Sequence, residues 1–268
     1  MVGRGDVVAA PVVPRERDLR RLAGIVSEQR DDIPAQGVPL SLLSDLASQI
    51  RCDVISFEGF DSSSEITWFM QAIRGHEPVT YDSPDDDPVD PLHWKLYWDC
   101  APCSHPDRTG DLRTVVRIAD FYSSRQWHST GMYTDLYRPK GMEHELMVSL
   151  PAAAGRHAPG PGRTLRMFLF RGPGSDFSEA DYALLTLLRP HMHQAYLDAE
   201  RRRHPVPTLT PRQWQLVDML AAGHTNAQIA RRLGISDSTV RKHLENVYRR
   251  LEVSSRAAAI TRAFSHQP

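Results

Sequence analysis

The sequence lacks the features that mark secreted, membrane-spanning or disulfide-rich proteins. It has only three cysteines among 268 residues, which is too few for a disulfide scaffold. No signal peptide precedes it, and no uninterrupted apolar run is long enough to cross a bilayer. We therefore expect a cytoplasmic protein that does not insert into a membrane.

The motifs of the common enzyme classes are missing as well. We find no nucleophile elbow, no glycine loop that cradles phosphate, no histidine-rich metal motif and no paired carboxylates on one face. A phosphorylatable receiver domain also fits poorly, because Asp31 and Asp32 are followed by Pro34 and not by the end of a strand. We predict that the protein is not an enzyme and has no cofactor.

Two cysteines lie close together in the sequence. Cys100 and Cys103 are followed by His105, and His93 and Asp99 are near, which suggests zinc or redox chemistry. A structural zinc usually needs a second ligand pair at fixed spacing, and none is present. We favour two free cysteines in a loop, with a metal site or a switchable disulfide as the alternatives.

The nearly neutral total charge hides two oppositely charged parts. The chain has 32 Lys and Arg against 33 Asp and Glu. From Pro205 onward nine residues are basic and four are acidic, so this part carries +5 and the remainder −6. A basic module joined to an acidic one is expected when only one end of the protein meets a polyanion.

Helix start signals recur through the last sixty residues. Thr210 with Gln213 and Thr225 with Gln228 form capping boxes, and Ser236 can cap a third helix. Glycines stand where the first two helices should stop. The expected helices span 211–222, 225–233, a long segment from 236, and 255–264.

The third of these helices combines a buried stripe with a basic outer face. The stripe has the spacing i, i+4, i+7, i+11 and consists of Val240, Leu244, Val247 and Leu251. The opposite side then presents Arg241, Lys242, Glu245 and Arg249, with Ser238 and Thr239 near the helix start. Such side chains suit base edges and phosphates. A lone basic helix is more often a solvated surface, but three capped helices and a two-residue turn favour a helix-turn-helix.

These residues resemble the LuxR-type (GerE-type) helix-turn-helix family. The resemblance rests on Leu209–Arg212, Ala222–Gly223, Thr225–Asn226, Gln228–Ala230, Leu233–Ser236, Thr239–Arg241, His243 and Leu251–Arg256. It implies a four-helix module that inserts its third helix into the major groove of double-stranded DNA and dimerises largely through its fourth. By position, Arg241, Lys242 and Glu245 would face bases. The phosphate or backbone contacts would be Asn226, Ser236, Thr239, His243 and Arg249.

The first two hundred residues mix helix and strand patterns. Strand-like runs occupy 52–60, 66–73, 145–150 and 165–170, and helical patterns occupy 15–30, 39–50, 92–98, 123–138 and 178–203. This order predicts an α+β domain in which helices cover a sheet. Over residues 35–200 it resembles a GAF-like sensor, on the segments Asp120–Tyr122, Gln126–Tyr133 and Asp176–Ser178.

Aromatic side chains are concentrated in this part of the chain. We expect most of them to be core, and we expect a subset to line a pocket between the sheet and the inserted helices. The candidates for a small-molecule pocket are Trp68, Trp94, Trp98, Tyr122, Trp127 and Tyr133.

The sequence therefore predicts four segments: a disordered start at 1–14, a GAF-like sensor or dimerisation domain at 15–200, a linker at 201–208 and a LuxR-type helix-turn-helix domain at 209–268. We interpret the chain as a sequence-specific, dimeric transcriptional regulator modulated by a small ligand or partner. The alternative is a regulator whose N-terminal domain only dimerises and binds no effector.

Overall fold

The chain divides into two compact units, residues 1–203 and 204–268. The computed structural model describes residues 16–28, 30–32, 34–81, 89–152, 163–203 and 209–264. The predicted disordered start at 1–14 lies outside the described residues. The predicted linker begins later than expected, because residues 201–203 belong to the last helix of the first unit and 204–208 are not described.

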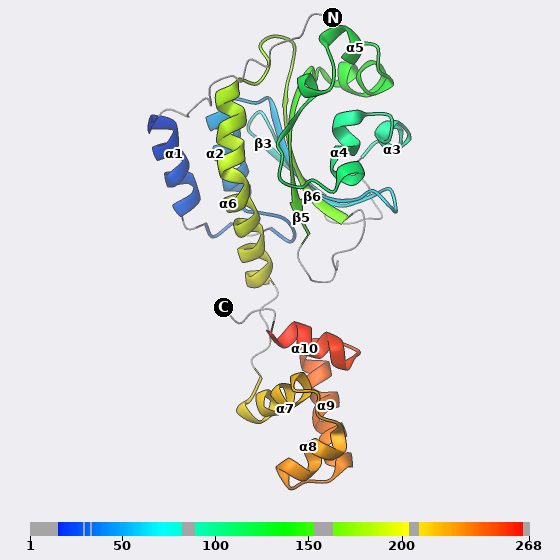
Figure 1. The fold of residues 1–268 in the computed structure, drawn as a ribbon. Coiled ribbons are helices and arrows are strands. Elements are labelled where there is room, and N and C mark those ends of the chain that lie inside the picture. Colours follow the sequence, from blue (N-terminus) through cyan, green and yellow to red (C-terminus); the bar gives the residue numbers. More distant parts are fainter. Residues whose placement is uncertain are drawn as a thin grey trace, which may run out of the picture. The chain divides into compact units, whose positions relative to one another are not determined.

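A six-stranded antiparallel sheet forms the centre of the N-terminal unit, with strand order β3-β2-β1-β6-β5-β4 (Figure 1). Its strands are β1 (Val54–Asp61), β2 (Ile66–Arg74), β3 (Glu77–Tyr81), β4 (Val116–Arg117), β5 (His144–Pro151) and β6 (Arg163–Arg171). The four predicted strands are β1, β2, β5 and β6. The short edge strands β3 and β4 were not predicted, because they are exposed or only two residues long.

Alternation along the central strands gives the sheet two different faces. On β1, Ile55 and Phe57 belong to one hydrophobic core, whereas Phe60 belongs to the other. On β6, Leu169 belongs to the first core and Phe168 to the second. This period of two is the geometry of an extended chain, and it lets one sheet support helices on both sides.

Three helices cover the first face of the sheet: α1 (Glu16–Ser27), α2 (Leu40–Ile50) and α6 (Glu179–Arg203) (Figure 1). They bury their apolar side chains against the sheet, with Leu43, Leu46 and Leu185 completely enclosed. Trp68 lies on this face as well, and a Cβ at Gly59 would come within 2.1 Å of its ring. Only glycine at position 59 allows this close approach.

Shorter helical segments cover the second face: α3 (Pro91–Tyr97), α4 (Ala101–Thr109), η2 (Ile118–Asp120), α5 (Ser124–Trp127), the π-helical η3 (Met132–Tyr137) and η4 (Arg138–Lys140). The single helix predicted over 123–138 is wrong: α5 ends at Trp127, and a separate π-helical segment follows. The loop predicted around Cys100 is also wrong, because α4 begins there despite its prolines, which include one at its start and Pro106 inside it.

The C-terminal unit is a bundle of four short helices: α7 (Pro211–Ala221), α8 (Asn226–Leu233), α9 (Asp237–Leu251) and α10 (Arg256–Phe264). All four match the predicted segments to within two residues. The α+β N-terminal unit and the helical C-terminal unit confirm the predicted fold class. Within the described ranges, no helix is long and apolar enough to cross a membrane.

One charged side chain is completely buried in the second face of the sheet. Arg166 of β6 has a relative exposure of 0%. Its guanidinium donates to Asp107 Oδ2 at 2.7 Å and to the Tyr97 hydroxyl at 2.6 Å. It also donates to the carbonyl oxygen of Cys103 at 2.8 Å. The arginine thus fastens α3 and α4 to the sheet, since a buried charge requires partners on every side.

Removal of Asp107 should show how strongly its ion pair with the buried Arg166 stabilises the fold. Asp107→Ala leaves the Arg166 charge buried and without its carboxylate, so we expect a loss of about 3–5 kcal/mol in the free energy of unfolding. Urea denaturation followed by tryptophan fluorescence would measure it. Asp198→Ala is the matched control, because Asp198 pairs with Arg201 on the surface and should lose no more than about 1 kcal/mol. Equal losses in the two variants would contradict the prediction.

Candidate nucleic-acid interface and effector cavity

Side-chain caps fix where the helices of the C-terminal unit begin. Thr225 and Gln228 form a reciprocal capping box at the start of α8, and the glutamine oxygen accepts from the Thr225 amide at 2.8 Å. Ser236 Oγ accepts from the Thr239 amide at the start of α9, at 3.1 Å. Gly234 closes α8 in the left-handed conformation, with φ of 66°, which a residue with a Cβ rarely adopts. The turn between α8 and α9 therefore follows from local chemistry.

The inner face of α9 holds this pair of helices in place. Its predicted stripe, Val240, Leu244, Val247 and Leu251, is buried. Val240 and Leu244 pack in a core with α7 and α8, and Val247 and Leu251 pack in a second core with α10. Both cores leave the opposite side of α9 in solvent.

The outer face of α9 carries most of the predicted DNA-contacting residues. Ser238, Arg241, Lys242 and Glu245 line one open surface depression together with Asp237. The side chain of Arg241 is 71% exposed, and its one ion pair with a described residue is the i,i+4 pair with Asp237, at 3.2 Å. Arg249 is exposed further along the helix. The remaining predicted contacts are Asn226, Thr239 and His243, which are half-buried, and Ser236, which is exposed but occupied as the α9 cap.

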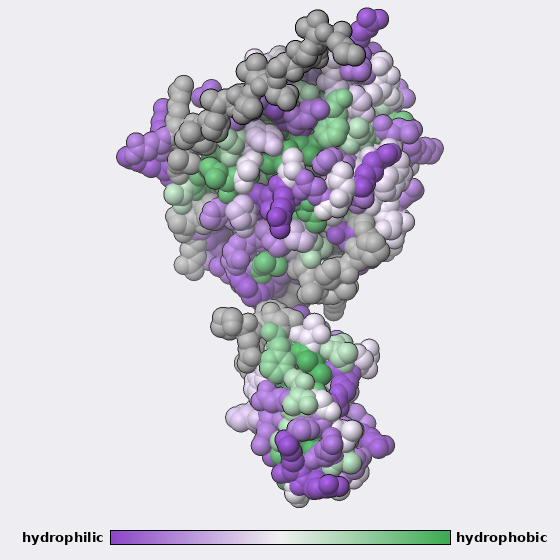
Figure 2. All heavy atoms as spheres, in the orientation of Figure 1, coloured by the Kyte–Doolittle hydropathy of each residue, from purple (hydrophilic) through white to green (hydrophobic). Residues whose placement is uncertain are grey.

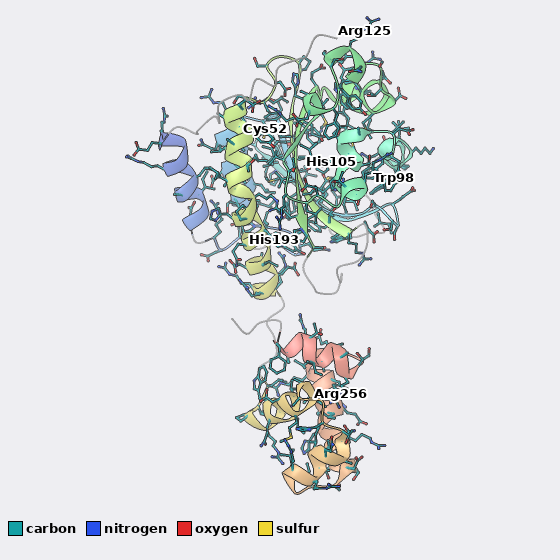
Figure 3. All side chains as sticks on the ribbon, in the orientation of Figure 1. Cys52, Trp98, His105, Arg125, His193 and Arg256 are labelled. Atoms are coloured by element: carbon teal, nitrogen blue, oxygen red, sulfur yellow. A yellow bond between two sulfur atoms is a disulfide. The ribbon has the colours of Figure 1, made fainter. Side chains whose placement is uncertain are left out.

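Two features of this unit were not assigned from the sequence. Arg231 and Arg232 are exposed in the last turn of α8, where they add two cations to the surface of this unit. Arg256, shown inside the C-terminal unit in Figure 3, donates to the carbonyl oxygens of Leu220 and His224 at 2.9 and 2.8 Å. It therefore joins α10 to the end of α7, a role that depends on tertiary contacts and has no local signal.

Short capped helices with a tight turn and an exposed basic third helix define a helix-turn-helix DNA-binding domain. Residues 207–263 match the family model described as bacterial regulatory proteins, luxR family. The C-terminal unit is thus a LuxR-type helix-turn-helix domain, and the predicted family is confirmed.

Two curated relatives show the same local similarity. The probable transcriptional regulatory protein SgaR of Hyphomicrobium methylovorum is 43% identical over 79 residues, which are 29% of this chain and 37% of SgaR. The putative HTH-type regulator YhjB of Escherichia coli K12 is 52% identical over 52 residues, or 19% of this chain and 26% of YhjB. The matched region thus spans well under half the length of these relatives.

Solved structures extend the similarity to the N-terminal fold. SdiA in complex with octanoyl-rac-glycerol aligns with 94% of this chain and 96% of its own, at 13% identity and a TM-score of 0.52. Another structure, of Escherichia coli SdiA, covers 92% of this chain and 95% of its own, at 12% identity and a TM-score of 0.49. The alignment with a TM-score of 0.52 shows that the chain shares its fold with SdiA.

A cavity of about 440 Å³ lies on the second face of the N-terminal sheet. Strands β1, β2, β3 and β6 form its floor, and residues from α3, η3 and η4 complete its walls. Its size falls in the range of small-molecule sites. We call it the β-face cavity.

None of the six predicted pocket aromatics lines the β-face cavity. Trp68 lies on the opposite face of the sheet, and Trp94 and Trp127 are buried in the second core. Tyr122 and Tyr133 pack against that core, and Trp98 is 42% exposed. The cavity is lined instead by Tyr137 of η3 and by the strand residues Phe60, Phe168 and Phe170, among others. The strand pattern did not single out these three phenylalanines.

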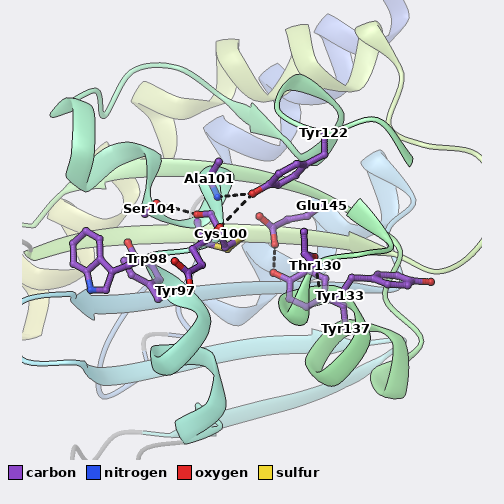
Figure 4. Close-up of a disulfide and its surroundings, with 12 residues drawn as sticks. Tyr97, Trp98, Cys100, Ala101, Ser104, Tyr122, Thr130, Tyr133, Tyr137 and Glu145 are labelled. Carbon is purple, nitrogen blue, oxygen red and sulfur yellow. Dashed lines mark hydrogen bonds between the residues drawn. A yellow bond between two sulfur atoms is a disulfide. The ribbon is translucent and has the colours of Figure 1, made fainter. Parts of the chain in front are cut away.

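Burial shifts the pKa values of two ionisable groups in and beside the cavity in the direction that favours their neutral forms. Burial raises the pKa of Glu145 to about 7, although the hydrogen bond from Tyr137 and the charge of Arg166 oppose the shift (Figure 4). Burial, together with the charges of Arg166 and Lys140, lowers the pKa of His93 to about 3. The His93 Nε2 atom is buried and has no hydrogen-bond partner within the described part of the chain.

Cys100 and Cys103 form a disulfide at the start of α4, where two free cysteines were expected (Figure 4). The physical reason is the helix: it brings residues three apart onto one face, with their Cα atoms 5.3 Å apart. Both residues are buried. Joined in this way, they offer no thiolate to zinc. Cys52 is the remaining cysteine of the chain, and burial raises the pKa of its thiol to about 12.

Glu145 and His93 should give opposite pH dependences of stability. The folded pKa of Glu145 lies above its ordinary value of 4.5, so its stabilisation is complete below pH 4.5 and is lost as the pH rises through 7. The folded pKa of His93 lies below its ordinary value of 6.5, so its stabilisation is present above pH 6.5 and is lost as the pH falls toward 3. Between pH 4.5 and 6.5 the two slopes cancel.

Replacement of either residue alone should reveal how the free energy of unfolding depends on pH through the other residue. In Glu145→Gln only the His93 dependence remains, so the free energy of unfolding should fall by about 3 kcal/mol as the pH falls from 6.5 to 4.5. In His93→Gln only the Glu145 dependence remains, so the free energy of unfolding should fall by about 3 kcal/mol as the pH rises from 4.5 to 7. Urea unfolding at half-unit pH steps would test this. Slopes of the same sign in both variants would contradict it.

Proposed function

We propose that this protein is a sequence-specific DNA-binding transcriptional regulator. The observation that carries the proposal is the outer face of α9, where Arg241 and Lys242 stand exposed on a helix fixed by two cores. A helix presented in this way fits the major groove, and its cations meet base edges or phosphates. The named functions of SgaR and YhjB, regulation in both cases, agree with this proposal.

The proposal includes a homodimer on a site with two half-sites. Figure 2 shows hydrophilic side chains over the visible face of the C-terminal unit near α8, and hydrophobic ones gathered toward α10. Trp214 and Phe264 pack edge to face at that end and remain partly exposed. Two copies could pair through the apolar end at α10, which would leave the α9 helix of each copy free to contact DNA.

We further propose that the N-terminal unit binds a small effector in the β-face cavity. Its volume and apolar walls support this proposal, and SdiA, which shares the fold, has been solved with octanoyl-rac-glycerol. The second candidate is a regulator whose N-terminal unit only dimerises. Thermal unfolding of the full chain against a metabolite library separates the two, because a ligand of the folded state raises the midpoint. A library without any stabilising compound would favour the second candidate.

Two arginines on α9 should have different effects on DNA binding. Arg241→Ala should weaken binding to a sequence selected from random DNA by about 1–3 kcal/mol and relax the preference at one base position, because we propose that this arginine reads a base. Arg249→Ala should weaken all sequences alike and lower the slope of log K against log salt by about one. Fluorescence anisotropy across a salt series measures both effects.

Arg125→Ala serves as the control for a lost cation, because Arg125 is an exposed residue of α5 in the other unit (Figure 3). It should leave affinity, sequence preference and salt slope unchanged. An Arg241→Ala variant that keeps the full base preference would refute the reading role of that residue. Failure to select any preferred sequence would refute the regulator proposal.

A further inference from the structure

The surface depression on the outer face of α9 is lined by as many acidic as basic residues. We call its five lining residues the reading face: Asp237, Ser238, Arg241, Lys242 and Glu245. Their formal charges cancel, although the chain from Pro205 onward carries +5. A carboxylate on a surface that meets DNA weakens the binding of phosphates, because it repels a polyanion. The two acidic side chains of the reading face therefore serve discrimination between DNA sequences better than they serve affinity.

Asp237 and Arg241 form an ion pair inside the reading face. The Arg241 Nη2 atom donates to Asp237 Oδ1 at 3.2 Å. Among the described residues of the C-terminal unit this is the only ion pair, although the chain from Pro205 onward has nine basic and four acidic residues. The ion pair thus lies on the surface where we expect DNA to bind.

The geometry of the helix places this pair at the start of α9. Asp237 is the first residue of the helix, and Arg241 follows one turn later, so both side chains lie on one face. An acidic residue four positions before a basic one is the more favourable order of such a pair. The carboxylate also lies in the first turn, where the helix dipole favours negative charge. In a helix-turn-helix, the residues near this end of the reading helix contact base edges.

The ion pair matters more for DNA binding than for folding. The side chains of Arg241 and Asp237 are 71% and 42% exposed, and an ion pair this exposed adds little to the stability of the fold. In the major groove, DNA displaces water from the pair, so the effective dielectric constant falls and the attraction grows. An arginine that is already held in one conformation also loses less side-chain freedom when it binds.

The donors that remain on Arg241 match guanine. A guanidinium carries five N–H donors in a planar fork, and Asp237 accepts from one nitrogen of this fork. An edge with two further N–H groups is left, and it fits the O6 and N7 acceptors of guanine. Adenine presents an amino group in place of O6, which meets a donor with another donor. The Asp237 carboxylate also opposes a turn of the guanidinium toward a phosphate, because it attracts the same cation.

We propose that Asp237 is a positioning residue that holds Arg241 for a bidentate contact with guanine. Guanine is then the required base at one position of the recognised DNA sequence. This inference rests on the proposed DNA-binding function, and it adds the base that Arg241 recognises and the residue that fixes the arginine.

Binding of the full chain to a sequence selected from random DNA tests this proposal, with the base at the position read by Arg241 changed to each of the other three. Fluorescence anisotropy should show that Asp237→Asn lowers the preference for guanine at least about fivefold, because residues in contact are energetically coupled. The same variant should bind unrelated DNA more tightly, since one negative charge is removed. Asp237→Glu should retain the preference, because it keeps a carboxylate four residues before Arg241.

Asp218→Asn is the matched control, because Asp218 is an exposed acid of α7 outside the reading face, and it should leave the preference unchanged. In an Arg241→Ala background, Asp237→Asn should have no further effect on the preference. A purely structural role of Asp237 would instead weaken all sequences alike. A preference that survives in Asp237→Asn, a preferred base other than guanine, or an effect that persists without Arg241 overturns the inference. These outcomes leave the proposed function intact, whereas a selection without any preferred sequence refutes both.

Discussion

The N-terminal unit depends on one buried charge and the partners that it requires. Arg166 stands on the central strand β6 without contact to solvent, and its guanidinium reaches Tyr97 of α3 and Asp107 of α4. A guanidinium cannot be left unpaired in an apolar interior. This requirement fixes α3 and α4 over the second face of the sheet, and the β-face cavity is the space that these segments and η3 do not fill. The same charge also acts on the pKa values of Glu145 and His93.

The two units solve different physical problems. The C-terminal unit is small. Local caps fix its helix ends, and two small hydrophobic cores bury the inner face of α9. The outer face of α9 is therefore free to contact a polyanion. The N-terminal unit is large enough to bury polar groups beside an incompletely filled space. Helices fixed at their ends suit the reading of base edges, and a cavity with apolar walls and a few polar groups suits the recognition of a small molecule.

The accuracy of the sequence predictions follows this difference. The helices of the C-terminal unit were predicted closely, because Thr210, Thr225 and Ser236 act within three residues of their own positions. The predicted exposure of Arg241 and Lys242 followed from the stripe on the other side of α9. In the N-terminal unit the four main strands and α6 were predicted, whereas the broken helix after Ser123 and the short α4 were not. Their conformations depend on contacts with the sheet that leave no periodic pattern.

The sequence by itself determined the helix-turn-helix, the asymmetry of charge and the two-sided sheet, because caps, charges and periods of two or 3.6 residues are local properties. Only the tertiary structure decided which side chains meet across the chain. It placed Trp68 on the face opposite the cavity, joined Cys100 to Cys103, and brought Glu58, His93 and Tyr137 from three different elements to one space. Aromatic content predicted a core. The position of the cavity depended on the register of the strands and on the partners of Arg166.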